Sequence, residues 1–188
     1  MGTLFVDKLD PQSGTALELG SSGDTITIPS GATITNSGTA TGFGEANTPA
    51  FSAFLDSTQS LSDQTYTIVG FDNEIYDTDS AYDNSNFKFT VPSGKAGKYF
   101  FTAMLRFVNF TGEVRLVIYI NGSQKGYQSS YAGNKYQSLS AQFSADLSVG
   151  DYVQIQAWQD SGGSLNLAGD SSVPQQVHFQ GFKISSWF

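Results

Sequence analysis

Cysteine is absent from this 188-residue chain, and basic residues are few. Without Cys there is neither a disulfide nor a thiolate metal ligand, and the one histidine, His178, excludes a histidine-rich zinc site. Nine Lys and Arg residues stand against 17 Asp and Glu residues, which gives a formal charge of −8. This balance leaves no basic face for nucleic acid, so we expect no nucleic-acid partner.

Long apolar runs are also missing. No stretch approaches the roughly 20 apolar residues that cross a membrane, so we expect no membrane insertion. The opening residues, MGTLFVDKLDPQSG, lack the basic segment and apolar core of a secretory signal. Helical periodicity is not evident anywhere in the chain. The sequence therefore predicts an all-β protein without these export or membrane signals.

Aromatic residues and turn formers, in contrast, are plentiful. The chain has 15 Phe, 9 Tyr and 2 Trp residues, which supply large side chains for a core. Its 20 Gly residues and many Ser, Thr, Asn and Asp residues supply turns. A disordered chain is poor in aromatics, so this composition indicates a globular β-protein.

Short alternating runs follow one another closely from residue 47 onward. Asn121-Gly122, between two such runs, is a strong hairpin signal. This density of short strands favours a β-sandwich or jelly roll. The predicted strands are 49–55, 66–71, 87–91, 98–107, 114–120, 124–131, 137–146, 152–158 and 177–184.

The N-terminal part has a different pattern. Within residues 14–36, short apolar stripes alternate with polar residues and are broken by turns. One such ribbon buries too little to be stable alone, so we expect it to wind with two other copies into a stalk or to pack on a larger surface. A meander lying on its own domain is the alternative. Residues 37–48 are a glycine-rich candidate linker. We therefore divide the chain into 1–46, a β-stalk or attachment segment with the linker, and 47–188, a knob.

The knob resembles a known family through several motifs. Phe71, Asp77, Tyr82 and Phe89 have the spacing of the complement component 1q globular head, whose jelly roll is shared with the tumour necrosis factor family. The segments 97–101, 147–153 and 179–184 are similar to its later motifs. The resemblance implies a ten-strand jelly roll that forms a compact homotrimer around an aromatic core. The expected core or trimer aromatics are Phe71, Tyr82, Phe89, Tyr99, Phe101, Phe179 and Phe182.

Residues 6–33 carry a second resemblance. They are similar to the opening of structural proteins from marine bacteriophages, particularly those that infect cyanobacteria. This resemblance implies a virion protein that is assembled in the host cytoplasm and released by lysis, and whose N-terminal segment binds other virion proteins. We expect a trimeric fibre or knob on the capsid or tail, with a role in assembly and host-surface adhesion. A capsid decoration protein without a receptor role, and a lectin-like or calcium-dependent binding module, are the alternatives.

Three tyrosines surround the segment SSYAGNK and are candidate receptor contacts. Tyr127, Tyr131 and Tyr136 stand among Ser, Gly and Asn residues, a composition typical of adaptable contact surfaces. We predict that they contact a host glycan or protein. The alternative is that strand tyrosines pack on the core or on the trimer interface.

Acidic residues gather between Phe71 and Phe89, two of the signature aromatics. Asp77, Asp79 and Asp83 are weak calcium candidates, because hard cations prefer several oxygen ligands. The run lacks the Gly and Glu positions of the helix-loop-helix calcium site, so solvated loop carboxylates are the favoured interpretation. His178 has no context for a catalytic nucleophile and is expected to be an ordinary strand histidine. We predict no enzyme activity, no catalytic residues and no cofactor apart from possible calcium.

Overall fold

The structure is a computed structural model that describes residues 9, 11, 13–38, 47–131 and 136–184. The chain divides into two compact units, Met1–Thr41 and Gly42–Phe188, and the boundary falls inside the glycine-rich stretch 37–48. The only helical element among the described residues is one short 3₁₀ turn, η1 (Pro174–Gln176). In these parts of the chain no helix is long and apolar enough to cross a membrane.

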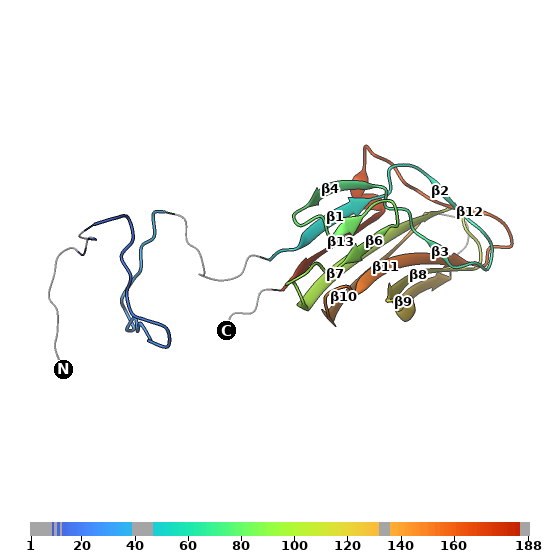
Figure 1. The fold of residues 1–188 in the computed structure, drawn as a ribbon. Helices are drawn as coiled ribbons and strands as arrows, with labels where there is room; N and C mark the ends of the chain where they lie inside the picture. Colours follow the sequence, from blue (N-terminus) through green and yellow to red (C-terminus); the bar gives the residue numbers. More distant parts are fainter. Residues whose placement is uncertain (1–8, 10, 12, 39–46, 132–135, 185–188) are drawn as a thin grey trace. The chain divides into compact units, whose positions relative to one another are not determined.

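The second unit is a sandwich of two sheets (Figure 1). Within each sheet the paired strands are antiparallel, and the strand axes of the two sheets have a similar orientation. Sheet A has the order β2-β12-β7-β13-β1-β4. In addition, β10 pairs with β7 along the edge opposite to β13. Its strands are β1 (Ala50–Phe54), β2 (Gln59–Leu61), β4 (Asn73–Asp77), β7 (Gly97–Val108), β10 (Gln137–Leu147), β12 (Leu165–Leu167) and β13 (His178–Lys183).

Sheet B has the order β5-β6-β11-β8-β9, and β3 pairs with β11. The β8–β9 hairpin closes through Asn121 and Gly122, whose φ angles of 51° and 73° suit the turn that Asn-Gly predicts. The strands of this sheet are β3 (Thr67–Ile68), β5 (Tyr82–Asp83), β6 (Lys88–Thr90), β8 (Glu113–Ile120), β9 (Ser123–Tyr131) and β11 (Tyr152–Gln159).

The all-β jelly roll predicted from the sequence is confirmed, with thirteen strands among the described residues where ten were expected. Each of the nine predicted strands is present. The four strands that were not predicted are β2, β4, β5 and β12, which have two to five residues each. Runs of that length are too short for a period-two pattern to stand out.

The core lies between the sheets and is built largely of aromatic rings. Phe51 stacks on Tyr82 and on Phe89, with ring centroids 5.1 Å apart in both pairs. The Tyr82 hydroxyl is satisfied by donating to the carbonyl of Phe71 at 3.0 Å. Of the seven expected core or trimer aromatics, six are buried: Phe71, Tyr82, Phe89, Tyr99, Phe101 and Phe179.

Phe182 is the seventh of these aromatics, and it does not enter the core. Side chains alternate along β13, so Phe179 and Gly181 face inward while Phe182 faces outward from sheet A. It remains 38% exposed and packs against Phe100, with ring centroids 5.7 Å apart. Phe182 therefore lies on the outer face and not in the core of the chain, and its place in a trimer interface remains a prediction.

The described residues of the N-terminal unit, 13–38, contain turns but no strand. Two of the turns expected to break the apolar stripes form, at residues 21–24 and 29–32. The Asp24 N–H donates to the Ser21 carbonyl at 2.9 Å, and the Ala32 N–H donates to the Pro29 carbonyl at 3.1 Å. The β-stripes do not pair with one another in the described residues 13–38 of one chain. Their winding with other copies, or packing on a larger surface, remains a prediction. The larger apolar side chains of the N-terminal unit are 47–59% exposed: Leu17, Leu19, Ile26, Ile28 and Ile34.

Candidate binding surfaces

The outer face of sheet B carries an ion pair whose carboxylate is buried. Alternation along β8 sends Val114 into the core and turns Glu113 and Arg115 outward. Arg115 donates through Nε and one Nη to the two carboxylate oxygens of Glu113, at 2.7 and 2.6 Å. This two-point geometry fixes the guanidinium plane. Although it faces outward, Glu113 is only 4% exposed.

Aromatic rings surround this ion pair. The Arg115 guanidinium lies over the rings of Trp158 and Tyr127, 4.2 and 5.2 Å from their centroids. The Tyr131 hydroxyl donates to Glu113 at 2.8 Å. Tyr66 lies 6.3 Å from Trp158 between ring centroids. We call this surface the Arg115 face; its residues are Tyr66, Glu113, Arg115, Tyr119, Tyr127, Tyr131 and Trp158.

Charges on the Arg115 face stabilise each other. The hydrogen bonds from Arg115 lower the pKa of Glu113, and the one from Tyr131 adds to this effect. The pKa of Arg115 is raised, chiefly by its hydrogen bond to Glu113. The pKa of Tyr131 is raised, chiefly because its hydroxyl bonds to the same carboxylate. At neutral pH the face therefore presents a compensated ion pair among exposed tyrosines.

The outer face of sheet A is more apolar. Phe182 and Phe100 are register partners, as are His178 and Met104, so all four point outward from adjacent strands. Phe54 is the partner of His178 on the other side. We call this surface the Phe182 face; its residues are Phe54, Phe100, Met104, His178 and Phe182.

His178, the one histidine, is a structural residue of this strand. Its Nδ1 lies 2.8 Å from the carbonyl oxygen of Gln175, and it is 9% exposed. Burial lowers its pKa.

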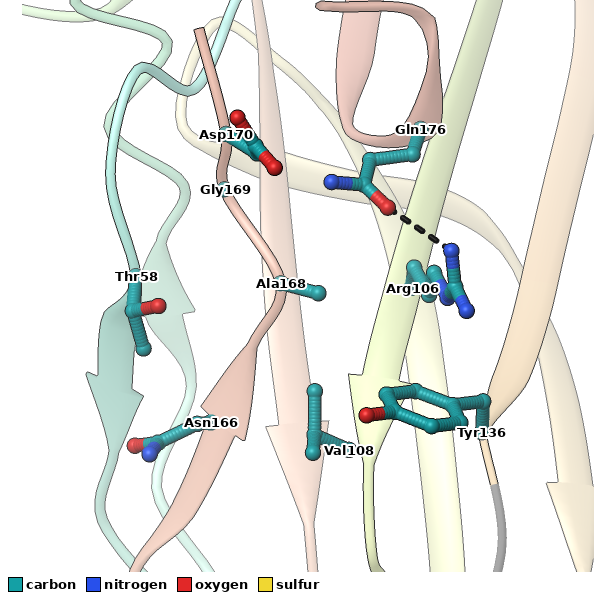
Figure 2. Close-up of a pocket in the computed structure, with 9 residues that line it drawn as sticks. All are labelled: Thr58, Arg106, Val108, Tyr136, Asn166, Ala168, Gly169, Asp170 and Gln176. Carbon is teal, nitrogen blue, oxygen red and sulfur yellow. Dashed lines mark hydrogen bonds between the residues drawn. The ribbon is translucent and has the colours of Figure 1, made fainter. Parts of the chain in front are cut away.

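A polar pocket opens at the other end of β7. Arg106 donates to Oε1 of Gln176 at 2.8 Å, and its guanidinium lies 4.5 Å from the ring centroid of Tyr136 (Figure 2). Arg106 lies six positions along β7 from Phe100, a distance of about 20 Å. We call this cavity of about 360 Å³ the Arg106 pocket; it is lined by Thr58, Arg106, Val108, Tyr136, Asn166, Ala168, Gly169, Asp170 and Gln176.

The three tyrosines predicted to contact a receptor belong to two different surfaces. Tyr127 and Tyr131 lie on the Arg115 face, whereas Tyr136 lies beside the Arg106 pocket at the start of β10. Their exposed fractions are 49%, 74% and 60%, so none of them packs in the core of the chain. Their contact with a receptor remains a prediction.

The acidic candidates for calcium organise turns of the chain. The Asp77 carboxylate accepts the main-chain N–H groups of Asp79 and Tyr82, at 3.2 and 2.8 Å. Asp83 accepts the side-chain amide of Asn86 at 2.7 Å, which is the main cause of its lowered pKa. Among the described residues no three Asp, Glu or His side chains come together in a group that could hold a metal ion.

Sequence reasoning missed both arginines, although the sequence holds a signal for them. The chain has only two Arg residues, Arg106 and Arg115, and each stands alone in an apolar strand pattern. Each occupies an outward position and lies over a tyrosine ring. An isolated Arg in an otherwise apolar strand could have been singled out, because a buried strand face would exclude it.

The fold and these surfaces define a class of protein: a two-sheet β jelly roll of the kind that typically serves as a non-enzymatic binding module. The C1q domain model matches residues 50–184, more than half of the chain. The chain therefore belongs to the C1q domain family. No curated protein matches it.

Solved structures of low sequence identity share the fold. The globular domain of zebrafish complement 1qA is 18% identical, covers 72% of this chain and 97% of its own, and has a TM-score of 0.53. Murine APRIL at pH 8.0 is 14% identical, with coverages of 72% and 98% and a TM-score of 0.56. Eiger TNF from S. frugiperda is 13% identical, with coverages of 72% and 91% and a TM-score of 0.50.

Proposed function

We propose that this chain is a homotrimeric bacteriophage virion protein whose C1q-like knob contacts the host surface. The observation that carries the proposal is the N-terminal unit, whose Leu and Ile side chains at alternate positions are about half exposed in one chain. Such stripes are unfavourable in water unless a partner covers them. Three copies wound together would bury all of them, and a trimeric knob would bring three N-terminal segments to one place.

The Phe182 face supports self-association of the knob. It places the exposed Phe182 beside Phe100 on the outer side of sheet A, and the other sheet formed by the described residues lies on the opposite side. Exposed aromatic patches of this kind are typical of protein interfaces. The resemblance of the knob to a trimeric family agrees with this use of the face.

The virion assignment rests on the resemblance of residues 6–33 to marine phage structural proteins. The adhesion role rests on the Arg115 face. Tyrosines with few rotatable bonds, held by a fixed ion pair, give a contact surface that loses little entropy on binding. In this proposal the N-terminal segment binds the particle, and the Arg115 face is directed to the host.

Oligomeric state tests the assembly part of the proposal. Light scattering of the full-length chain should give a mass of roughly 61 kDa, since each chain is 20.2 kDa. The knob alone, residues 42–188, is a compact unit with its own core and should also be a trimer. A monomeric knob would contradict the proposal.

The virion part needs a different test. Immunogold labelling of purified particles should show the protein on the capsid or the tail. Antibodies against the knob should then reduce adsorption to host cells. Unchanged adsorption, together with particles that lose stability when the protein is removed, would instead indicate a decoration protein without a receptor role.

A further inference from the structure

The Arg106 pocket holds two opposite charges that do not pair with each other. Among the described residues, Arg106 has one hydrogen bond, to the neutral amide of Gln176, and no carboxylate partner. Asp170 uses Oδ1 to accept the main-chain N–H and the hydroxyl of Ser172, at 2.9 and 2.6 Å. Its Oδ2 has no hydrogen-bond partner in the described part of the chain. The pocket therefore offers guanidinium donors and a carboxylate acceptor together.

Further polar groups lie between these charges and around them. Figure 2 shows Thr58 and Asn166 on one side of the pocket and Arg106 and Tyr136 on the other. Thr58 and Asn166 are exposed, so their side chains are accessible to a ligand. Amide, hydroxyl and phenol groups can each donate or accept a hydrogen bond. A ligand that fits must offer donors and acceptors in several directions.

The floor of the pocket is apolar. Val108 and Ala168 lie between the two polar sides (Figure 2), and both are half-buried. The ring of Tyr136 adds apolar surface at one edge and is 60% exposed. A ligand with an apolar face and a polar rim would cover this floor while keeping its polar groups at the sides.

Several ligand classes fit poorly. A phosphate or sulfate would meet the carboxylate of Asp170, and a divalent cation would find only this one carboxylate together with the charge of Arg106. A wholly apolar ligand would remove water from both charges without replacing its hydrogen bonds. A neutral pyranose ring satisfies all of these conditions, because its hydroxyl groups both donate and accept and its C–H face is apolar.

We propose that the Arg106 pocket binds a neutral saccharide, with one terminal hexose of a glycan seated on Val108 and Ala168. Neighbouring hydroxyls accept hydrogen bonds from Arg106 and donate to the free oxygen of Asp170. Asn166, Thr58 and Gln176 contact the remaining hydroxyls. The volume of about 360 Å³ lies at the small end of ligand pockets, which suits one or two sugar rings. This inference concerns one chain and does not depend on the trimer or on the virion assignment.

The test uses the full-length chain and defined sugars. It is screened against immobilised oligosaccharides that end in glucose, galactose or mannose, and against a matched set that ends in glucuronic acid. Affinity for the best neutral probe is then measured by titration calorimetry. We expect at least one neutral probe to bind at sub-millimolar concentration.

Two variants connect binding to the pocket. Asp170→Asn retains an oxygen for Ser172 but loses the charged acceptor, so affinity should fall about tenfold or more. Asn166→Ala should weaken binding several-fold. Asp146→Asn, which removes an exposed carboxylate on β10, is the matched control and should leave affinity unchanged. Circular dichroism melting confirms that each variant is folded.

Three results would overturn the inference. One is no binding of any neutral probe at millimolar concentration. Another is binding of the glucuronic acid probes alone, strengthened in Asp170→Asn, which would make the pocket an anion site. The third is a neutral sugar whose affinity is the same in both pocket variants as in the control.

Discussion

At the scale of single residues, the two arginines show how partners decide the role of one side-chain type. Both project from β-strands and lie over tyrosine rings. Arg115 is bound at two points by Glu113, a carboxylate that is almost fully buried. Among the residues that the structure describes, Arg106 bonds only to the neutral amide of Gln176 and keeps free donors. The first is therefore a stabilising residue of its face, and the second is available for a ligand.

Replacing Arg115 should destabilise the fold. Arg115→Met keeps much of the side-chain volume against Trp158 but leaves the buried carboxylate of Glu113 without its main partner. We expect the free energy of unfolding to fall by about 2 kcal/mol, measured by urea denaturation. Lys88→Met removes another cation over a tyrosine ring, that of Tyr152, and should cost well under 1 kcal/mol. Equal effects of the two substitutions would contradict this role of Arg115.

The same ion pair makes stability depend on pH. The pKa of Glu113 is lowered in the folded protein, so the pair contributes fully above the ordinary value of 4.5 and its contribution is lost as pH falls through the folded pKa. Asp83, Asp151 and Asp170 also have lowered pKa values and act in the same direction. The stability difference between wild type and Arg115→Met should therefore shrink on acidification below pH 4.5. A stability difference that stays constant down to the lowest pH at which both proteins fold would contradict this contribution of the ion pair.

At the scale of elements, β13 shows how alternation and close packing set a sequence motif. Gly181 faces the core directly beneath the ring of Phe101. A Cβ added there would collide with that ring and would lie 3.0 Å from the carbonyl oxygen of Phe100. The glycine between Phe179 and Phe182 is thus required by the approach of β7, its neighbour in sheet A.

A methyl group at this position should be poorly tolerated. Gly181→Ala is expected to lower the free energy of unfolding by about 2 kcal/mol, because core rings must shift to make room. Gly126→Ala in β9 is the control, since its Cβ meets no atom within 4 Å, and it should change stability by less than about 0.5 kcal/mol. Urea denaturation of both variants measures the difference. If Gly181→Ala were as stable as Gly126→Ala, the core around Phe101 would accommodate a methyl group at little cost in free energy.

How far the elements could be predicted depends on their length and on their partners. β7, with twelve alternating residues, and the β8–β9 hairpin, with Asn121-Gly122, carry their own signals in the sequence. The two residues of β5 form a strand only because β6 lies beside them. In the N-terminal unit the turns are local and were predicted, whereas the proposed pairing of its stripes would involve other chains.

The candidate sites were harder to predict because they are assembled across the fold. The Arg115 face joins β8 to Tyr131 at the end of β9 and to Trp158 on β11, strands that only the sheet pairing brings together. The Arg106 pocket combines β7, β12, η1 and the start of β10. Of the residues that line this pocket, the sequence singled out only Tyr136, because Ser, Gly and Asn residues surround it. The same signal applied to Tyr131, so the sequence could not show that the two tyrosines belong to different surfaces.

At the scale of the whole molecule, sheet A carries two surfaces of opposite character at its two ends. The Phe182 face is aromatic at Phe100 and Phe182 and suits self-association, whereas the Arg106 pocket, about 20 Å from Phe100 along β7, is polar and suits a soluble ligand. Met104 and His178 lie between these two regions. The Arg115 face on sheet B adds a third, independent surface.

Assembly through the Phe182 face can be tested with a single charge. Phe182→Asp places a carboxylate where the ring is 38% exposed, so the fold should persist while the proposed trimer dissociates. Light scattering should then give the mass of one chain, 20.2 kDa, with a β-type circular dichroism spectrum retained. Val149→Asp, at an apolar side chain that is 52% exposed in the turn between β10 and β11, is the matched control and should remain trimeric. A trimer that survives Phe182→Asp would contradict assembly through this face.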